Sequence, residues 1–257
     1  MRFERKVELL RVEKYEGEET DKFFNDVILM AGGEPLEYIL GEMQFCGTTI
    51  DLSLRPNIPK EETEYWVYQA IQDIKDKKYK IYSTDDMSKN IRVLDLFSGS
   101  GSIGISFLKK IPNCTLDFIE INSIFKKQIE ISLIKNILDL SRVKIIIGDV
   151  WSGATGLYDV ITAVPPYVST EGEGGKGVKR LHKSNLNSIN SNDEYHYYKL
   201  ILSNINNYLS NNGVLFLEFD VNQREIIEQI ATDNNLSNYF FLTNTYRHDF
   251  VFIYIKA

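Results

Sequence analysis

One stretch of this 257-residue chain constrains its fold more than any other: VLDLFSGSGSIGISFLKK, residues 93–110. An apolar strand runs into a turn that contains Gly99 and Gly101, and the residues from 102 onward have helical spacing. Glycines in such a turn let the backbone approach a ligand, and the free amides at the start of the helix attract electron-rich groups. The stretch therefore predicts a ligand site at the end of a buried strand.

From residue 91 onward, strand-like and helix-like segments alternate. Strands are predicted at 91–96, 115–121, 143–148, 159–163, 213–219, about 239–244 and 250–256, and helices at 102–110, 123–137, 194–210 and 222–235. This alternation is typical of an α/β fold with a mainly parallel sheet, covered by helices on both faces. The last two strands have no room for a crossover helix between them, so we expect an antiparallel C-terminal hairpin.

The N-terminal residues have a different pattern. Two helical segments are expected within 1–34, a hairpin over 43–56, and a helix over EETEYWVYQAIQDIKD, residues 61–76. We therefore predict a short helical and hairpin N-terminal part, 1–64, followed by a larger ligand-binding domain, 65–257.

Composition excludes several classes of protein. A net charge of −7 and a pI near 5.2 disfavour general binding to nucleic acid or to anionic lipid. Two cysteines and three histidines without ligand spacing suggest neither a disulfide framework nor a metal site. Charges break every apolar run near the start, and no segment is apolar for long enough to span a bilayer. The sequence predicts a cytoplasmic protein, and a monomer is expected.

Three acidic residues follow successive predicted strands. Asp95 precedes the glycine loop, Glu120 ends the next strand about 20 residues beyond the loop, and Asp149 follows the third strand in IIIGDVW. A carboxylate at Glu120 can accept both hydroxyls of a ribose, and one at Asp149 can accept an adenine amino group. Their order at strand ends predicts a cofactor that contains adenosine.

Asp95 distinguishes between two such cofactors. A carboxylate repels the pyrophosphate of a nicotinamide dinucleotide but attracts the ammonium group of S-adenosylmethionine. We therefore predict S-adenosylmethionine, with S-adenosylhomocysteine as the product. The residues expected to line its site are Asp95, Phe97, Ser98, Gly99, Ser100, Gly101, Glu120, Asp149 and Val150.

These motifs resemble a known family. DLFSGSGSIG, IEIN, GDVW and AVPPYV have the order and spacing of class I S-adenosylmethionine-dependent methyltransferases, which implies a Rossmann-like fold. The Pro-Pro-Tyr of AVPPYV is similar to the Asn-Pro-Pro-Tyr signature of the members that methylate planar nitrogens. GEPLEYILGEMQFCGTTIDLSLRPNIPKEETEYWV, residues 33–67, resembles the connector of the release factor glutamine N5-methyltransferases, and GVLFLEFDVNQREII resembles their stretch after the fifth core strand.

The resemblance implies a substrate and a catalytic corner. The substrate would be the side-chain amide of the Gln in the Gly-Gly-Gln loop of a peptide chain release factor, and the catalytic residues would be Val164, Pro165, Pro166 and Tyr167. In the family signature, the Asn side chain and the carbonyl of the first proline accept hydrogen bonds from the amide nitrogen. Valine at 164 supplies no acceptor, so we expect transfer slower by on the order of 10²-fold than with Asn.

Other departures from the family and other functions stay open. Lys60 replaces an arginine, polar residues near 191–194 replace a Gly-Gly pair, and the N-terminal helical part is short. The polar segment 169–193 is either a substrate lid or low-complexity sequence. The first alternative function is an amino-methyltransferase for nucleic acid, with the basic stretch KGVKRLHK, 176–183, against the backbone; the second is a non-catalytic relative that binds S-adenosylmethionine.

Overall fold

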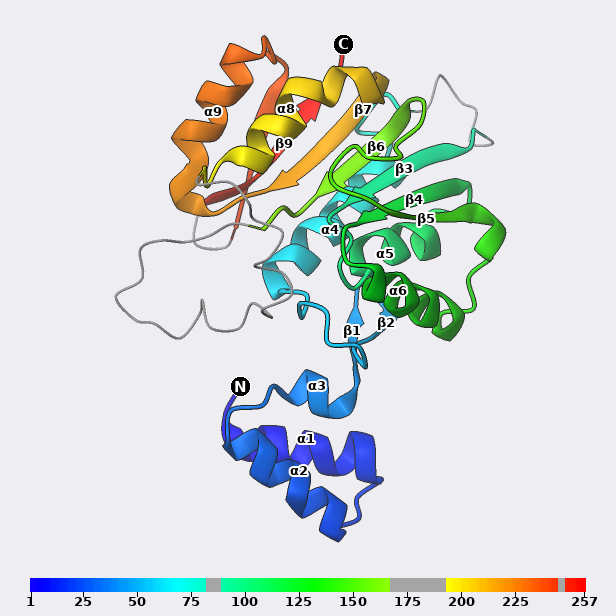
Figure 1. Cartoon of the computed structure of the whole chain (residues 1–257), viewed down its shortest axis with the longest axis vertical. Helices are drawn as coiled ribbons and strands as arrows, with labels where there is room; N and C mark the ends of the chain where they lie inside the picture. The colour runs from blue at the N-terminus through cyan, green and yellow to red at the C-terminus, as the bar shows by residue number, and fades with distance from the viewer. Residues whose placement is uncertain (82–88, 167–192, 245–247) are drawn as a thin grey trace.

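The computed structural model describes residues 1–81, 89–166, 193–244 and 248–257. Its centre is a seven-stranded sheet with the order β5-β4-β3-β6-β7-β9-β8 (Figure 1). The strands are β3 (Ile91–Leu96), β4 (Cys114–Glu120), β5 (Val143–Ile147), β6 (Tyr158–Ala163), β7 (Leu209–Glu218), β8 (Tyr239–Thr243) and β9 (Asp249–Ile255). Strands β3 to β7 are parallel, and β9 runs antiparallel to β7 and β8. The predicted α/β fold and its C-terminal hairpin are confirmed.

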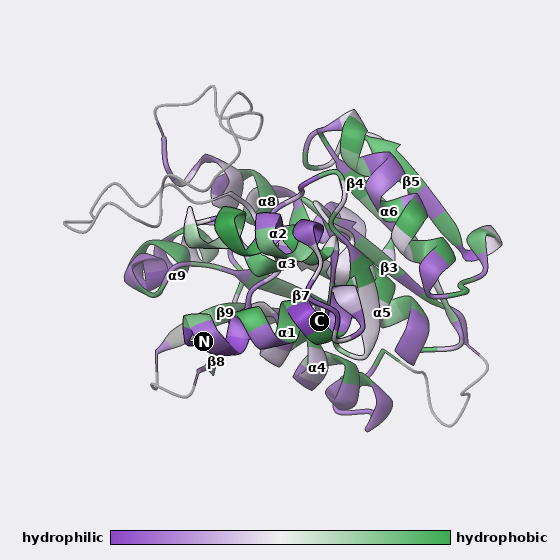
Figure 2. Ribbon diagram, turned by 90° about the horizontal axis from the view of Figure 1, so that it is seen from below, coloured by the Kyte–Doolittle hydropathy of each residue, from purple (hydrophilic) through white to green (hydrophobic). Residues whose placement is uncertain are grey.

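Helices cover both faces of the sheet. One face carries α4 (Glu61–Lys75), α5 (Ser102–Lys110) and α6 (Ser123–Lys135), and the other carries α8 (His196–Tyr208) and α9 (Arg224–Asp233). Successive strand residues point to opposite faces, so Val93 packs with the first set of helices and Leu94 with the second. Both colours of the hydropathy scale run along the helices in Figure 2, because each helix turns an apolar side to the sheet and a polar side outward.

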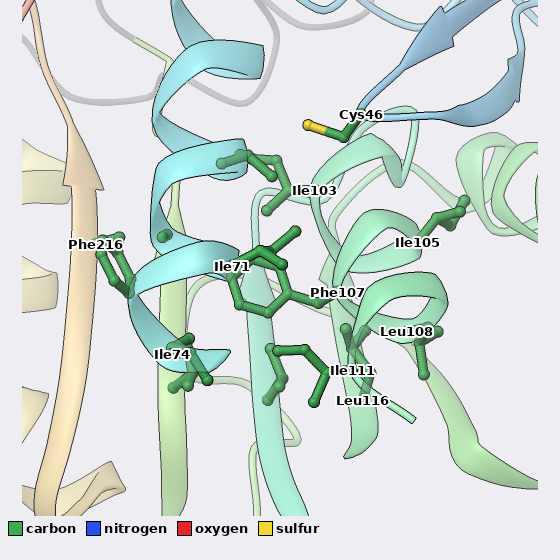
Figure 3. Close-up of a cluster of buried hydrophobic side chains, with 14 of the residues drawn as sticks. Cys46, Ile71, Ile74, Ile103, Ile105, Phe107, Leu108, Ile111, Leu116 and Phe216 are labelled. Carbon is green, nitrogen blue, oxygen red and sulfur yellow. The ribbon is translucent and has the colours of Figure 1, made fainter. Parts of the chain in front are cut away.

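Helix α4 joins the N-terminal part to the sheet through large buried side chains. Ile71 and Ile74 lie between Phe216 of β7 and the side chains of α5, as Figure 3 shows. Trp66 is fully buried and stacks on Phe216 with ring centroids 5.9 Å apart. Burial of this many aromatic and aliphatic groups fixes the position of α4 on β7.

The predicted elements are present, and the differences lie at their ends. β3 and α5 have the bounds that the sequence predicts. β7 begins at Leu209 instead of 213, because Leu209 pairs with Tyr158 before a register shift. α9 begins at Arg224 instead of 222, after a 3-10 turn, η3 (Val221–Gln223), that Asp220 caps. A second 3-10 turn, η1 (Leu140–Arg142), precedes β5.

The N-terminal part contains α1 (Phe3–Tyr15), α2 (Asp21–Ala31), α3 (Leu36–Leu40), β1 (Glu42–Phe45) and β2 (Thr48–Asp51). The short α3, between Pro35 and Gly41, was not expected from the sequence. The three helices lie apart from the sheet in Figure 1 and have a small core of their own: Leu10, Phe23, Met30, Leu36 and Ile39. The division at 64/65 stays a prediction, and this boundary falls within α4. Within the described ranges, each helix is too short or too polar to cross a bilayer.

A row of polar side chains on α6 holds the β1–β2 hairpin. Gln128, Ser132 and Asn136 are spaced four residues apart, so they share one helix face, and all three are buried. Asn136 exchanges two hydrogen bonds with the backbone of Thr49, and Ser132 Oγ accepts from Asp51 N at 3.0 Å. Gln128 accepts from Leu54 N and donates to Asp51 O. The three side chains thus form hydrogen bonds with the backbone of β2, as a neighbouring strand would.

Gln128→Leu is expected to lower the free energy of unfolding by about 2–4 kcal/mol, because two buried backbone groups lose their partner. Urea unfolding of the full chain measures this loss. Lys127→Leu, at an exposed position on the same helix, is the matched control. Equal stability of the two variants would show that the row does not hold the hairpin.

Candidate active site

The predicted site residues lie at the point where the order of the strands reverses. β3 has β4 on one side and β6 on the other, and the chain passes from β3 to β4 and β5 before it returns to β6 and β7. In open α/β sheets, ligands bind at the carboxyl edge beside such a switch point. The loop after β3 and the corner after β6 therefore lie at the same edge.

The glycine loop is held in a compact turn. Phe97, Gly99 and Gly101 all have positive φ, at 57°, 51° and 78°. Gly101 N donates to Ser98 O at 2.7 Å, and Ser98 Oγ donates to the carbonyl oxygens of Asp95 and Ile119. Gly101 is the N-cap of α5 and has no side chain to cap the helix. In the first turn of α5, Ser102 N donates instead to Ser100 Oγ and Gly104 N to Asp95, so the loop itself satisfies part of the helix start.

Asp95 is buried beneath this loop. Its Oδ1 accepts from Thr162 Oγ1 at 2.7 Å, and its Oδ2 accepts from Gly104 N at 3.2 Å. Burial raises the pKa of Asp95 to about 7, although both hydrogen bonds act in the opposite direction. The carboxyl group ties β3 to β6 and to α5, a positioning role that the sequence did not reveal. Its contact with an ammonium group stays a prediction.

Glu120 lies against the glycine loop. Its Oε2 accepts from Gly99 N and its Oε1 from Asn122 N, both at 2.8 Å. The side chain is buried, and burial raises the pKa of Glu120 while the backbone amides oppose the rise. The structure thus brings the loop and this acid together at the edge of the sheet where the sequence predicts the ribose.

Asp149 lies two residues beyond β5 and is exposed. Val150, with φ 44°, is buried next to it. Across from this turn, the ring of Tyr197 on α8 meets Phe97 edge to face, with centroids 5.0 Å apart. Burial and the charge of Asp149 both raise the pKa of Tyr197, so this ring lies near the carboxylate. Tyr197 is a candidate site residue that the sequence analysis missed, since no local pattern distinguishes it from a core tyrosine.

The corner after β6 is described as far as residue 166. Val164 is half-buried against the core of the α4 face, Pro165 is buried and Pro166 is half-buried. Tyr167, the basic stretch 176–183 and nearly all of the predicted lid lie outside the described residues. In the described part of the chain, no three His, Cys, Asp or Glu side chains are grouped to hold a metal ion.

Comparison with known proteins agrees with this geometry. Residues 81–197 match the family model of the methyltransferase small domain. The release factor glutamine methyltransferase of Streptococcus pneumoniae is 25% identical over 217 residues, which cover 83% of this chain and 72% of the relative. The corresponding protein of Haemophilus influenzae is 27% identical over 79% of this chain and 69% of its own length. The predicted resemblance is confirmed.

Solved structures show the same fold at low identity. A methyltransferase from Pyrococcus furiosus has a TM-score of 0.56 and 13% identity, and the similarity covers 93% of this chain and all of that one. A 16S rRNA methyltransferase of T. thermophilus, in complex with AdoMet and guanosine, has a TM-score of 0.56 and 15% identity over 84% of this chain and 50% of that one. The fold is that of the class I methyltransferases.

The similarity to the release factor glutamine methyltransferases extends beyond the domain model. The match to the Streptococcus pneumoniae relative covers 83% of this chain, which is more than residues 1–197 or residues 81–257 alone contain. It therefore includes residues on both sides of the segment 81–197. Those residues belong to the hairpin and helix connector or to the strands after β6, where the sequence motifs are more specific than a glycine loop.

Proposed function

We propose that this methyltransferase transfers a methyl group from S-adenosylmethionine to the side-chain amide nitrogen of the Gln in the Gly-Gly-Gln loop of a peptide chain release factor. The observation that carries the proposal is the similarity to release factor glutamine methyltransferases on both sides of the core domain. The switch-point site supports it, because its residues suit an adenosine-containing donor. We further propose that the protein acts in the cytoplasm as a monomer.

The described residues fit the methyl donor. Glu120 would accept from the ribose hydroxyls, Asp149 from the adenine amino group, and Asp95 would attract the ammonium group. Phe97 and Val150 would pack against the adenine, beside the start of α5. When bound, S-adenosylmethionine supplies an electrophilic methyl group on a sulfonium. The residues named above would then orient the donor.

At the corner, the substrate nitrogen must be aligned and made more reactive. An amide nitrogen is a poor nucleophile because its lone pair is delocalised into the carbonyl, so acceptors for its two hydrogens are required. The carbonyl of Pro165 would accept one hydrogen, and the two prolines keep it rigid. Val164 supplies no acceptor for the other hydrogen, and Tyr167 would pack against the planar amide.

Mass spectrometry of a release factor incubated with this protein and S-adenosylmethionine tests the proposal. We expect the Gln of the Gly-Gly-Gln loop to gain one methyl group. A release factor with Asn in place of that Gln is the matched control and should gain none. Methyl transfer to nucleic acid alone would favour the amino-methyltransferase alternative. Donor binding without any transfer would favour the non-catalytic one.

A further inference from the structure

Glu218 lies beside Val164 at the same edge of the sheet. β6 and β7 are parallel, and their register pairs Thr162 with Phe216 and Ala163 with Leu217. The next residues along both strands are Val164 and Glu218. Because side chains alternate, both point to the face that carries α4. Val164 contacts the core of that face, and Glu218 bonds to α4.

Two donors on α4 hold the Glu218 carboxylate. Thr63 Oγ1 and Trp66 Nε1 each donate to Oε2 at 2.7 Å. The side chain is only 3% exposed, and both of these bonds use the same oxygen. Neither bond uses Oε1, so Oε1 is the atom that can accept from a further donor.

A buried carboxylate is a costly way to attach a helix to a strand. Burial raises the pKa of Glu218 and the nearby charge of Glu62 adds to this, whereas Lys60 and the two donors oppose it. Apolar residues would join α4 to β7 without that cost, as Ile71, Ile74 and Phe216 do further along the helix (Figure 3). A charged group at this position in a methyltransferase site indicates a chemical role.

We propose that Glu218 supplies the second acceptor for the substrate nitrogen, the role that an Asn at position 164 would have. The inference rests on the proposed function. The nitrogen lone pair forms a bond to the methyl carbon, the carbon–sulfur bond breaks, and its electron pair stays on sulfur. The nitrogen then loses a proton to Glu218 Oε1, which later releases it to water. With Glu218 in this role, methyl transfer does not require an Asn at position 164. We therefore expect this chain to transfer the methyl group as fast as a variant with Asn at 164, and not slowly as the sequence alone predicts.

Glu218→Gln tests the assignment with minimal change of shape. Thr63 and Trp66 both donate, so the amide oxygen must face them, and the NH2 group then faces the N–H of the substrate. We expect single-turnover methyl transfer to a release factor to slow by on the order of 10²-fold. Affinity for S-adenosylmethionine, measured by calorimetry, should change by less than about threefold. Glu61→Gln, at an exposed position on α4, is the matched control and should keep the parent rate.

Val164→Asn separates a chemical role from a structural one. In the Glu218→Gln background it should restore the rate by about tenfold or more, whereas in the parent chain it should change the rate by less than about threefold. Failure of this rescue, or a parent rate in Glu218→Gln, would overturn the role of Glu218. A hundredfold gain from Val164→Asn in the parent chain would overturn it as well, and that variant does not depend on whether Glu218→Gln folds. Absence of transfer in every variant, Val164→Asn included, would instead overturn the proposed function, and with it this role.

Discussion

Gly101→Val is expected to weaken S-adenosylmethionine binding by on the order of 10²-fold from a micromolar dissociation constant. Gly101 has a φ of 78°, which a β-branched residue adopts only with strain. A Cβ atom here would lie 2.9 Å from Ile129 Cγ1 and 3.2 Å from Ile105 Cδ1. Valine at this position would therefore press into the core under the loop. We expect the loop to shift in response and to lose the hydrogen bond from Gly101 N to Ser98 O.

Calorimetric titration with S-adenosylmethionine measures the effect. Gly33→Val is the matched control, because Gly33 also has a positive φ, 100°, but has no atom within 4 Å of the added Cβ and lies in the N-terminal part. It should lower stability while donor affinity stays at the parent value. Parent affinity in Gly101→Val would show that the turn after β3 is not the donor site.

The sequence predicted the helices and strands that are determined by short stretches of sequence. β3 and α5 were located residue for residue, since an apolar run, a glycine turn and a helical repeat are each visible in a short window. The position of Glu120 at the same edge as the glycine loop also followed, because parallel strands end at one edge, whereas its direct hydrogen bond with Gly99 N was not predicted.

The side-chain contacts that depend on packing between segments far apart in the sequence were not predictable. The burial of Glu218 requires the register of β7 against β6 and the docking of α4, whose donors Thr63 and Trp66 lie 155 and 152 positions earlier in the chain. The row of Gln128, Ser132 and Asn136 looks like an ordinary polar face until the hairpin is placed against it. Asp95 was correctly located at a strand end, but its burial against Thr162 depends on β6 lying next to β3.

Asp95→Asn is expected to change how stability depends on pH. With a folded pKa of about 7 against an ordinary value of 3.8, Asp95 is protonated in the folded protein and ionised in the unfolded chain between about pH 4 and 7. The folded state binds the extra proton, so this group makes the free energy of unfolding fall as pH rises through that window. The full effect is at most about 4 kcal/mol. When protonated, Asp95 can donate to Thr162 Oγ1, whose own proton then turns to Leu94 O, 3.4 Å away.

Asn carries no titrating proton, so Asp95→Asn should gain stability relative to the parent as pH rises from about 5 to 7.5, by about 2–3 kcal/mol. Urea unfolding of both proteins at the two pH values measures this difference, and Asp149→Asn, at an exposed carboxylate on the same edge, is the matched control.

The protonation state of Asp95 also affects the predicted binding of the donor. If Asp95 holds the ammonium group of the donor, only its ionised form does so, and parent affinity for S-adenosylmethionine should rise with pH through about 7 while that of Asp95→Asn stays flat. A pH-dependent stability difference without this rise in affinity would leave Asp95 as a positioning residue that ties β3, β6 and α5 together, with the ammonium bound elsewhere on the loop.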